Sequence, residues 1–224
     1  MPKGKVFVVG VGPGSAGWVS AHVRDLVLSA DILVGWEQDF KPVKNLVKSQ
    51  QIYLQECHNY LEIPGKAALE AETSGATVVV LKTGDPLVAP AGLEGVLKTF
   101  EGFDISIVPG ISTVQLAAAK AGVSLTDSAI ITYHPLPHDG GSDLRKKRKR
   151  ILKAIENGLH VIVLTGVRQM PRQTAQFLID QGIDPSTACI VFENLGLPEE
   201  RFTNGCLNEV VSQSFNWKSV MIIL

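Results

Sequence analysis

Aromatic residues and cysteines are both scarce in this chain. Phe, Trp and Tyr together make up 6% of its 224 residues, which argues against a surface that stacks nucleic-acid bases. The three cysteines, Cys57, Cys189 and Cys206, lie far apart and form no C-x-x-C pair. This usage is typical of free thiols in a reducing compartment and predicts neither a disulfide framework nor a zinc motif.

Net charge and long apolar runs are also missing. The 21 Lys and Arg residues offset 22 Asp and Glu residues, so nothing in the overall charge favours nucleic acid or an anionic membrane. No apolar run approaches the ~18 residues that a membrane span needs, and the apolar stretch near the N-terminus is too short for a secretory signal. We therefore expect a soluble, cytoplasmic protein that binds neither nucleic acid nor membranes.

What the first half does contain is a regular alternation of short β-branched runs and helical patterns. Strands are expected at 6–11, 31–34, 77–81 and 105–108, and helices at 19–29, 64–73, 91–100 and 114–121. This order is typical of a parallel sheet with right-handed crossovers. The run at 77–81 is nearly all apolar, as expected of a strand that is covered on both faces.

The second half is also of the α/β class. Strands are expected at 129–133, 160–164, 189–192, 201–203 and 219–224, with a charged helix reaching 157 and another helix at 171–181. Composition becomes polar around Gly122, so we expect two domains, 1–122 and 123–224. Small-molecule sites favour the cleft between two such domains.

A glycine-rich loop follows the first expected strand. Gly12, Gly14 and Gly17 form G-x-G-x-x-G, and the acidic residues Glu37 and Asp39 lie about twenty residues further on, which formally satisfies a dinucleotide-binding fingerprint. Pro13, however, has no N–H to offer a pyrophosphate. A tight turn that simply needs glycine dihedral angles is an equally good interpretation.

Two further turns follow expected strands. Residues 83–86 read Thr-Gly-Asp-Pro, and residues 109–113 read Pro-Gly-Ile-Ser-Thr before a helix. Each has a plain structural alternative, a Gly-Asp-Pro turn or a helix cap. In an open α/β sheet, however, ligands bind at the carboxyl ends of the strands, so the three turns together predict a ligand site.

These turns carry a resemblance to a known family. VGVGPGS at 9–15, GDP at 84–86 and PGIS at 109–112 resemble the tetrapyrrole (corrin/porphyrin) methylases, which use S-adenosylmethionine. The resemblance implies the two-domain α/β fold of class III methyltransferases, with an active-site cleft between the domains. It also implies that the glycine loop lines this cleft without gripping a pyrophosphate.

Other segments are similar to the branch of the family that methylates C5 of cobalt-precorrin-7 in cobalamin biosynthesis. They are PGISTVQLAAAKAG at 109–122, LTG at 164–166 and ENLGLPEERF at 193–202. The resemblance implies a corrinoid substrate and a homodimer. Any cobalt would arrive with the substrate.

The resemblance also implies site residues. Contacts to S-adenosylmethionine fall on Pro13, Thr83, Gly84, Asp85, Val88, Ser112, Thr113, Thr165 and Leu195, and substrate contacts on Gly12, Gly14, His134 and Arg145. Where family members often have His-Gly-Arg, His134 is followed here by Pro135. No Ser-His-Asp or paired-carboxylate pattern requires a general base, so no catalytic residue is assigned. In-line methyl transfer disperses charge, and alignment in a dry cleft can supply most of its acceleration.

Two other signals have plain readings. The basic run at 145–150 is either the solvated start of a helix or a region that attracts substrate carboxylates. His134 and His138 are separated by prolines that prevent a helical metal-binding pair, so no metal ligands are assigned.

Two alternative functions stay open from the sequence. One is another methylase of the same fold, such as diphthine synthase. The other is a nicotinamide-dependent oxidoreductase built on the glycine loop.

Overall fold

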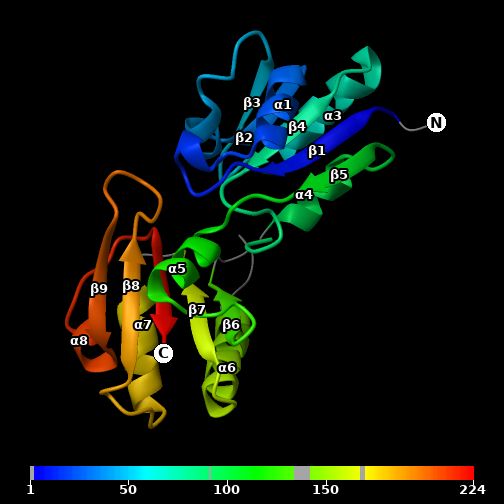
Figure 1. Cartoon of the computed structure of the whole chain (residues 1–224). Coiled ribbons are helices and arrows are strands. Elements are labelled where there is room, and N and C mark those ends of the chain that lie inside the picture. Colours follow the sequence, from blue (N-terminus) through cyan, green and yellow to red (C-terminus); the bar gives the residue numbers. More distant parts are fainter. Residues whose placement is uncertain (1–2, 91, 134–141, 167–169) are drawn as a thin grey trace. The chain divides into compact units, whose positions relative to one another are not determined.

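The computed structural model describes residues 3–90, 92–133, 142–166 and 170–224 (Figure 1). The chain divides into two compact units, Met1–Ser112 and Thr113–Leu224. The sequence places its boundary after Gly122, whereas this division assigns helix α5 (Thr113–Ala121) to the second unit. The reason is packing, because α5 lies against strands β7 (His160–Leu164) and β10 (Ser219–Ile223) of that unit.

The first unit is a five-stranded sheet with helices on both faces. Its strands are β1 (Lys5–Gly10), β2 (Ile32–Trp36), β3 (Gln51–Gln55), β4 (Val78–Lys82) and β5 (Asp104–Val108). Its helices are η1 (Ala16–Trp18), α1 (Ala21–Ser29), α2 (Glu37–Phe40), η2 (Lys41–Val43), α3 (Glu62–Ser74) and α4 (Leu93–Thr99). All pairings are parallel, in the order β3-β2-β4-β1-β5, which confirms the expected parallel sheet.

The central strands of this sheet are buried on both faces. In β4, Val78 and Val80 pack with the apolar side chains of α3 and α4, while Val79 and Leu81 pack with Val23 and Val27 of α1. The nearly continuous apolar run of β4 therefore has a direct cause, since alternate side chains enter two separate cores. The central strands position the turns that follow them.

The second unit has a mixed sheet in the order β6-β7-β10-β8-β9. Its remaining strands are β6 (Ser128–Thr132), β8 (Ala188–Glu193) and β9 (Arg201–Cys206), and its remaining helices are α6 (Ser142–Glu156), α7 (Met170–Asp180) and α8 (Leu207–Val211). β6 and β7 are parallel, and β10 runs antiparallel to both of its neighbours. β7 and β8 therefore end at the same edge of the sheet.

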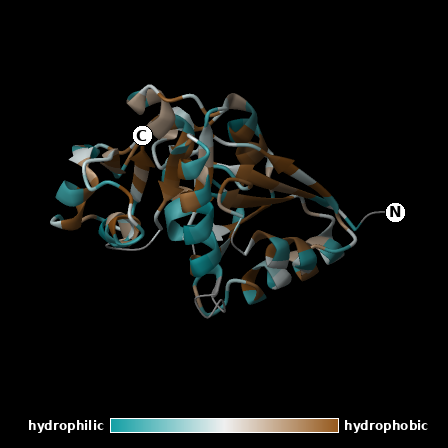
Figure 2. Cartoon of the chain, turned by 90° about the horizontal axis from the view of Figure 1, so that it is seen from below, coloured by the Kyte–Doolittle hydropathy of each residue, from teal (hydrophilic) through white to brown (hydrophobic). Residues whose placement is uncertain are grey.

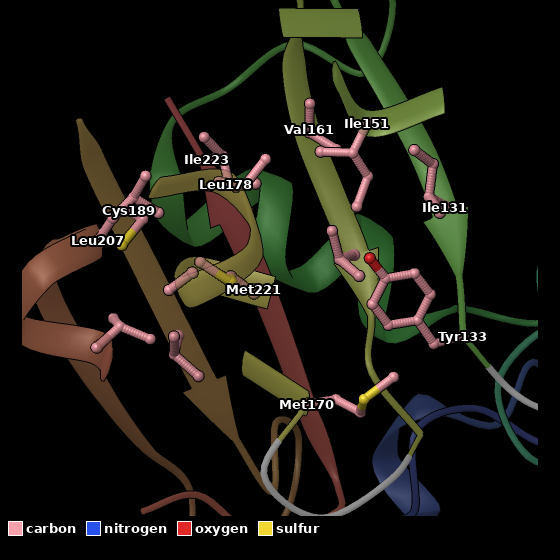
Figure 3. Close-up of a cluster of buried hydrophobic side chains, with 14 of the residues drawn as sticks. Ile131, Tyr133, Ile151, Val161, Met170, Leu178, Cys189, Leu207, Met221 and Ile223 are labelled. Atoms are coloured by element: carbon pink, nitrogen blue, oxygen red, sulfur yellow. The ribbon is translucent and has the colours of Figure 1, made fainter. Parts of the chain in front are cut away.

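One face of this sheet builds the core of the second unit. Ile131, Val161, Met221 and Ile223 point from the strands toward side chains of α6, α7 and α8, among them Leu178 (Figure 3). Figure 2 shows the strands as predominantly hydrophobic, whereas the helices carry hydrophilic stretches as well. In the described part of the chain, no helix combines the length and apolar character needed to cross a bilayer.

The cysteines differ sharply in accessibility. Cys57 is exposed, while Cys189 is buried in β8, and burial raises the pKa of its thiol to about 12. Because the thiolate is the reactive form, iodoacetamide should modify Cys57 in the native protein and leave Cys189 unmodified until the chain unfolds. Peptide mass spectrometry before and after denaturation measures this. Native labelling of Cys189 as fast as of Cys57 would contradict the packing around β8.

Candidate functional site

The turns after β1, β4 and β5 meet at one edge of the first sheet. Gly84 donates its N–H to the Gly12 carbonyl at 2.7 Å, and Gly12 donates to the Gly84 carbonyl at 3.4 Å. Both glycines have positive φ, +77° at Gly12 and +73° at Gly84, a conformation that side chains rarely allow. The sequence prediction that these turns come together is thus matched by direct bonds between two of them.

Gly110 and Gly10 bring the third turn into the same cluster. A Cβ added to Gly110 would lie 2.3 Å from the Gly84 carbonyl oxygen, and one added to Gly10 would lie 2.5 Å from the Gly110 nitrogen. Glycine is therefore required here by backbone packing within the protein itself. At Gly17, by contrast, an added Cβ would meet nothing within 4 Å.

Asp85 fastens two of these turns. Its Oδ1 accepts the backbone N–H groups of Leu87 at 2.8 Å and Val88 at 3.2 Å, and its Oδ2 accepts the N–H of Gly110 at 3.0 Å. Charge-assisted bonds of this kind are stronger than neutral ones. Asp85 therefore holds the turn after β4 against the turn after β5, in addition to any ligand contact.

Asp39 is a buried organising residue that the sequence places in a different role. Its Oδ2 accepts the Trp36 N–H at 3.0 Å, and its Oδ1 accepts the Thr83 N–H at 2.9 Å together with the Thr83 hydroxyl. Burial raises the pKa of the Asp39 carboxyl, and hydrogen bonds from Thr83 and Trp36 oppose that rise. The dinucleotide interpretation offers Asp39 or Glu37 as the ribose ligand; the structure commits both oxygens of Asp39 to the protein, whereas Glu37 is exposed.

Beside this carboxylate, Lys82 ends β4 as a partly buried cation. Burial lowers the pKa of the Lys82 ammonium, while the charge of Asp39 acts in the opposite direction. The signal that could have identified Asp39 is its position in α2. It is the third helical residue, from which an acidic side chain reaches back to the N–H at the helix start.

In the second unit, the turns after β7 and β8 both meet the start of β10. Thr165 is fully buried, and both its hydroxyl, at 2.9 Å, and its N–H, at 3.2 Å, donate to the Ser219 carbonyl. Asn194 donates its N–H to the Lys218 carbonyl at 2.9 Å. Leu195 lies buried between two positive-φ residues, Asn194 at +51° and Gly196 at +84°. The single hydroxyl proton of Thr165 is therefore committed to the Ser219 carbonyl.

Glu193 holds together the segments around the loop that carries Leu195, and no sequence motif identifies this role. It is buried at the end of β8, and both of its oxygens bond Arg201, at 2.9 and 2.7 Å. The Oε1 atom also accepts the N–H of Asn216. Glu193 therefore fixes the base of the loop that carries Leu195. No local pattern marks this role, because its partners lie on other segments.

The remaining predicted contact residues belong to different elements, and Ser112 lies beside the Gly84 turn, where an added Cβ on Gly84 would be 3.8 Å from the Ser112 Cα. Ser112 is buried at the end of the first unit, and Thr113 opens α5. Arg145 is exposed on α6 and, with Leu152 and Phe177, lines a groove of about 350 Å³ beside α7. His134 lies outside the described residues. Among the residues that are described, no group of three or more His, Cys, Asp and Glu side chains could hold a metal ion.

Comparison with known proteins places this geometry in a family. The sequence pattern of the Tetrapyrrole (Corrin/Porphyrin) Methylases matches residues 5–211. A probable cobalt-precorrin-7 C(5)-methyltransferase of Methanocaldococcus jannaschii is 29% identical over 97% of this chain and 96% of that protein. An S-adenosyl-L-methionine-dependent uroporphyrinogen III methyltransferase of Methanosarcina barkeri is 27% identical over 93% of this chain and 85% of that protein.

A solved structure extends the comparison. The uroporphyrin-III C-methyl transferase from Thermus thermophilus, complexed with S-adenyl homocysteine, superimposes with a TM-score of 0.77 at 25% identity, over 98% of this chain and 97% of that chain. The family pattern spans nearly the whole sequence, including all three glycine turns. The chain therefore belongs to the tetrapyrrole methylases and is a methyltransferase of that family.

Proposed function

We propose that this protein is an S-adenosylmethionine-dependent C-methyltransferase that methylates C5 of cobalt-precorrin-7. The single observation that carries the substrate assignment is the end-to-end similarity to the Methanocaldococcus protein, 29% identical over 97% of this chain. The motifs at 109–122 and 193–202, which resemble the C5-methylating branch, support the same assignment.

The residues of the first unit fit such a cofactor better than a dinucleotide. The edge formed by the three turns offers the exposed Thr83 side chain, the carboxylate of Asp85 and the exposed apolar side chain of Leu87, while Pro13 has no N–H. A carboxylate at this edge suits a sulfonium cation and repels a pyrophosphate. We assign the cofactor contacts of this unit to Pro13, Thr83, Gly84, Asp85, Val88 and Ser112. Contacts from Thr113, Thr165 and Leu195 stay predictions from the resemblance.

In this reaction the protein acts by holding the reacting groups in position. S-adenosylmethionine supplies the methyl group when bound. The fused turns hold backbone groups and the Asp85 carboxylate at fixed positions, so the entropy of alignment is lost during folding and not during reaction. Substrate contacts are proposed for Gly12, Gly14 and His134, and for Arg145, whose exposed guanidinium can attract the carboxylates of a corrinoid precursor.

Methyl transfer tests the substrate assignment directly. After incubation with S-adenosylmethionine and cobalt-precorrin-7, mass spectrometry should show a gain of one methyl group, and NMR with a labelled methyl should place it on C5. Methylation of a different carbon, or of uroporphyrinogen III alone, would overturn the substrate while leaving the family in place. The similarity to the Methanosarcina enzyme makes uroporphyrinogen III the second candidate.

Calorimetry tests the proposed cofactor independently of the proposed substrate. S-adenosylhomocysteine should bind and NAD should not, because Asp39 is already bonded to Trp36 and Thr83. Binding of NAD without S-adenosylhomocysteine would overturn the cofactor proposal. Methylation of a protein histidine would support a diphthine-synthase-like activity in place of the corrinoid one.

A further inference from the structure

Lys82 is a cation at the ligand-binding edge of the first unit that the proposed mechanism does not use. It ends β4, pairs with Gly10 of β1, and directly precedes the turn that contains Asp85. No Lys, Arg or His occurs in the described residues of the three turns, 11–15, 83–88 and 109–112. An anionic group of a ligand held by these turns therefore has Lys82 as the basic residue beside it.

The side chain of Lys82 leaves β4 on the same face as the fused turns. Alternate residues of a strand share a face, so Lys82 points to the side on which Val80 packs with α3 and α4. Gly10 lies level with Lys82 in the parallel pairing and has the same phase. A Cβ added to Gly10 would lie 2.5 Å from both the Gly84 carbonyl oxygen and the Gly110 nitrogen. The turns that contain these two glycines therefore pack beside Lys82, on the face from which its side chain emerges.

The ammonium group of Lys82 has no direct partner in the described part of the chain. It makes neither a hydrogen bond nor a salt bridge there, and Asp39 acts on it only through its charge. Asp39 already accepts three donors from Trp36 and Thr83, and Asp85 accepts three backbone N–H groups. Both of these carboxylates are thus engaged, while Lys82 is partly buried with its donors unused. An anionic partner stabilises a cation that is partly removed from water, and a bound ligand can supply one here.

We propose that Lys82 is a carboxylate-binding residue for the ligands of this edge. The inference rests on the proposed function, which gives the carboxylate two sources: the amino-acid end of S-adenosylmethionine and the acidic side chains of the corrinoid. In the cofactor, a short aliphatic chain separates the sulfonium cation from the carboxylate. Asp85 and Lys82 present the complementary pair of charges three residues apart, on either side of Gly84. The cofactor is therefore the first source to test.

Calorimetry with two ligands isolates the carboxylate. Lys82→Met keeps most of the side-chain length and removes the charge. Its affinity for S-adenosylhomocysteine should fall at least about tenfold, because a charge-assisted hydrogen bond is lost. Its affinity for methylthioadenosine, which has the same nucleoside and no amino-acid end, should not change. Lys82→Arg keeps a cation and should retain part of the affinity.

Initial rates of methyl transfer test the second source. If Lys82→Met binds S-adenosylhomocysteine normally but its KM for the corrinoid rises at least about tenfold with kcat retained, the carboxylate is that of the substrate, and the proposal stands. Unchanged affinity together with unchanged KM would overturn it. Calorimetry needs no methyl acceptor, so a wild type that binds S-adenosylhomocysteine without methylating cobalt-precorrin-7 would overturn the proposed substrate and leave the calorimetric test of Lys82 in force.

A matched control lies at the other end of the same sheet. Lys5→Met removes an exposed lysine at the start of β1 and should change neither the affinities nor KM. Urea denaturation separates binding from folding: Lys82→Met should be at least as stable as the wild type, because it removes a partly buried cation that has no hydrogen-bond acceptor. Equal losses of affinity for both calorimetric ligands, with lower stability, would show that Lys82 supports the turns and contradict a carboxylate contact.

Discussion

Gly110→Ala should strongly destabilise the first unit. The new methyl group would lie 2.3 Å from the Gly84 carbonyl oxygen and 2.6 Å from the Gly10 carbonyl carbon, and neither backbone atom can rotate away. Overpacking of this kind costs about 1–3 kcal/mol and more where backbone must move. We expect a loss of unfolding free energy at or above the upper end of that range, measured by urea denaturation. Binding of S-adenosylhomocysteine should weaken as well.

Gly17→Ala is the matched control. It changes the third glycine of the G-x-G-x-x-G loop after β1, where an added Cβ would meet nothing within 4 Å. We expect a change within about 0.5 kcal/mol, as for surface substitutions in general. Equal effects of the two substitutions would show that the turns are not in backbone contact.

Asp39→Ala should have the second large effect. It removes the acceptor for the Trp36 N–H, the Thr83 N–H and the Thr83 hydroxyl. Leaving a buried donor without a partner costs about 1–3 kcal/mol, so we expect a loss of about 2–4 kcal/mol in unfolding free energy once water reaches some of these groups. Affinity for S-adenosylhomocysteine should also fall, because Thr83 loses its anchor. Urea denaturation and calorimetry measure the two effects.

Two companion variants isolate the cause. Asp39→Asn keeps one carbonyl oxygen and should recover part of the stability and the affinity. Glu37→Ala removes the exposed carboxylate of the same short helix and should change neither. If Asp39→Ala lowered stability but left cofactor affinity in the folded fraction unchanged, Asp39 would be structural only and the Thr83 turn would not hold the cofactor.

Strong hydrophobic patterns allowed most of the fold to be predicted. β7 occupies the expected range, and β4, apolar from Val78 to Leu81, lies between two cores. β3 was not expected. It is an edge strand, in which the side chains of Ile52 and Leu54 are exposed to solvent and only those of Tyr53 and Gln55 are partly or fully buried. Strands are usually recognised because their apolar side chains are the buried ones, and in β3 the aliphatic side chains are exposed instead.

The sequence predicts where the site lies, but it does not predict the hydrogen bonds that build it. Turns at the carboxyl ends of parallel strands must gather at one edge, and the structure places the glycine turns there. Asp39 was interpreted as a ribose ligand because its spacing fits a fingerprint. Its actual partner, Thr83, is 44 residues away and is reached only through the pairing of β2 with β4. Glu193 depends on similar tertiary contacts.

The backbone contacts among Gly10, Gly12, Gly84 and Gly110 have a mechanical consequence. Loops normally move independently of one another and tolerate insertions. Here a shift of one turn must displace the other two, because no flexible side chain separates them. The edge therefore opens or closes as one cooperative unit, and a ligand that immobilises any single turn rigidifies all three.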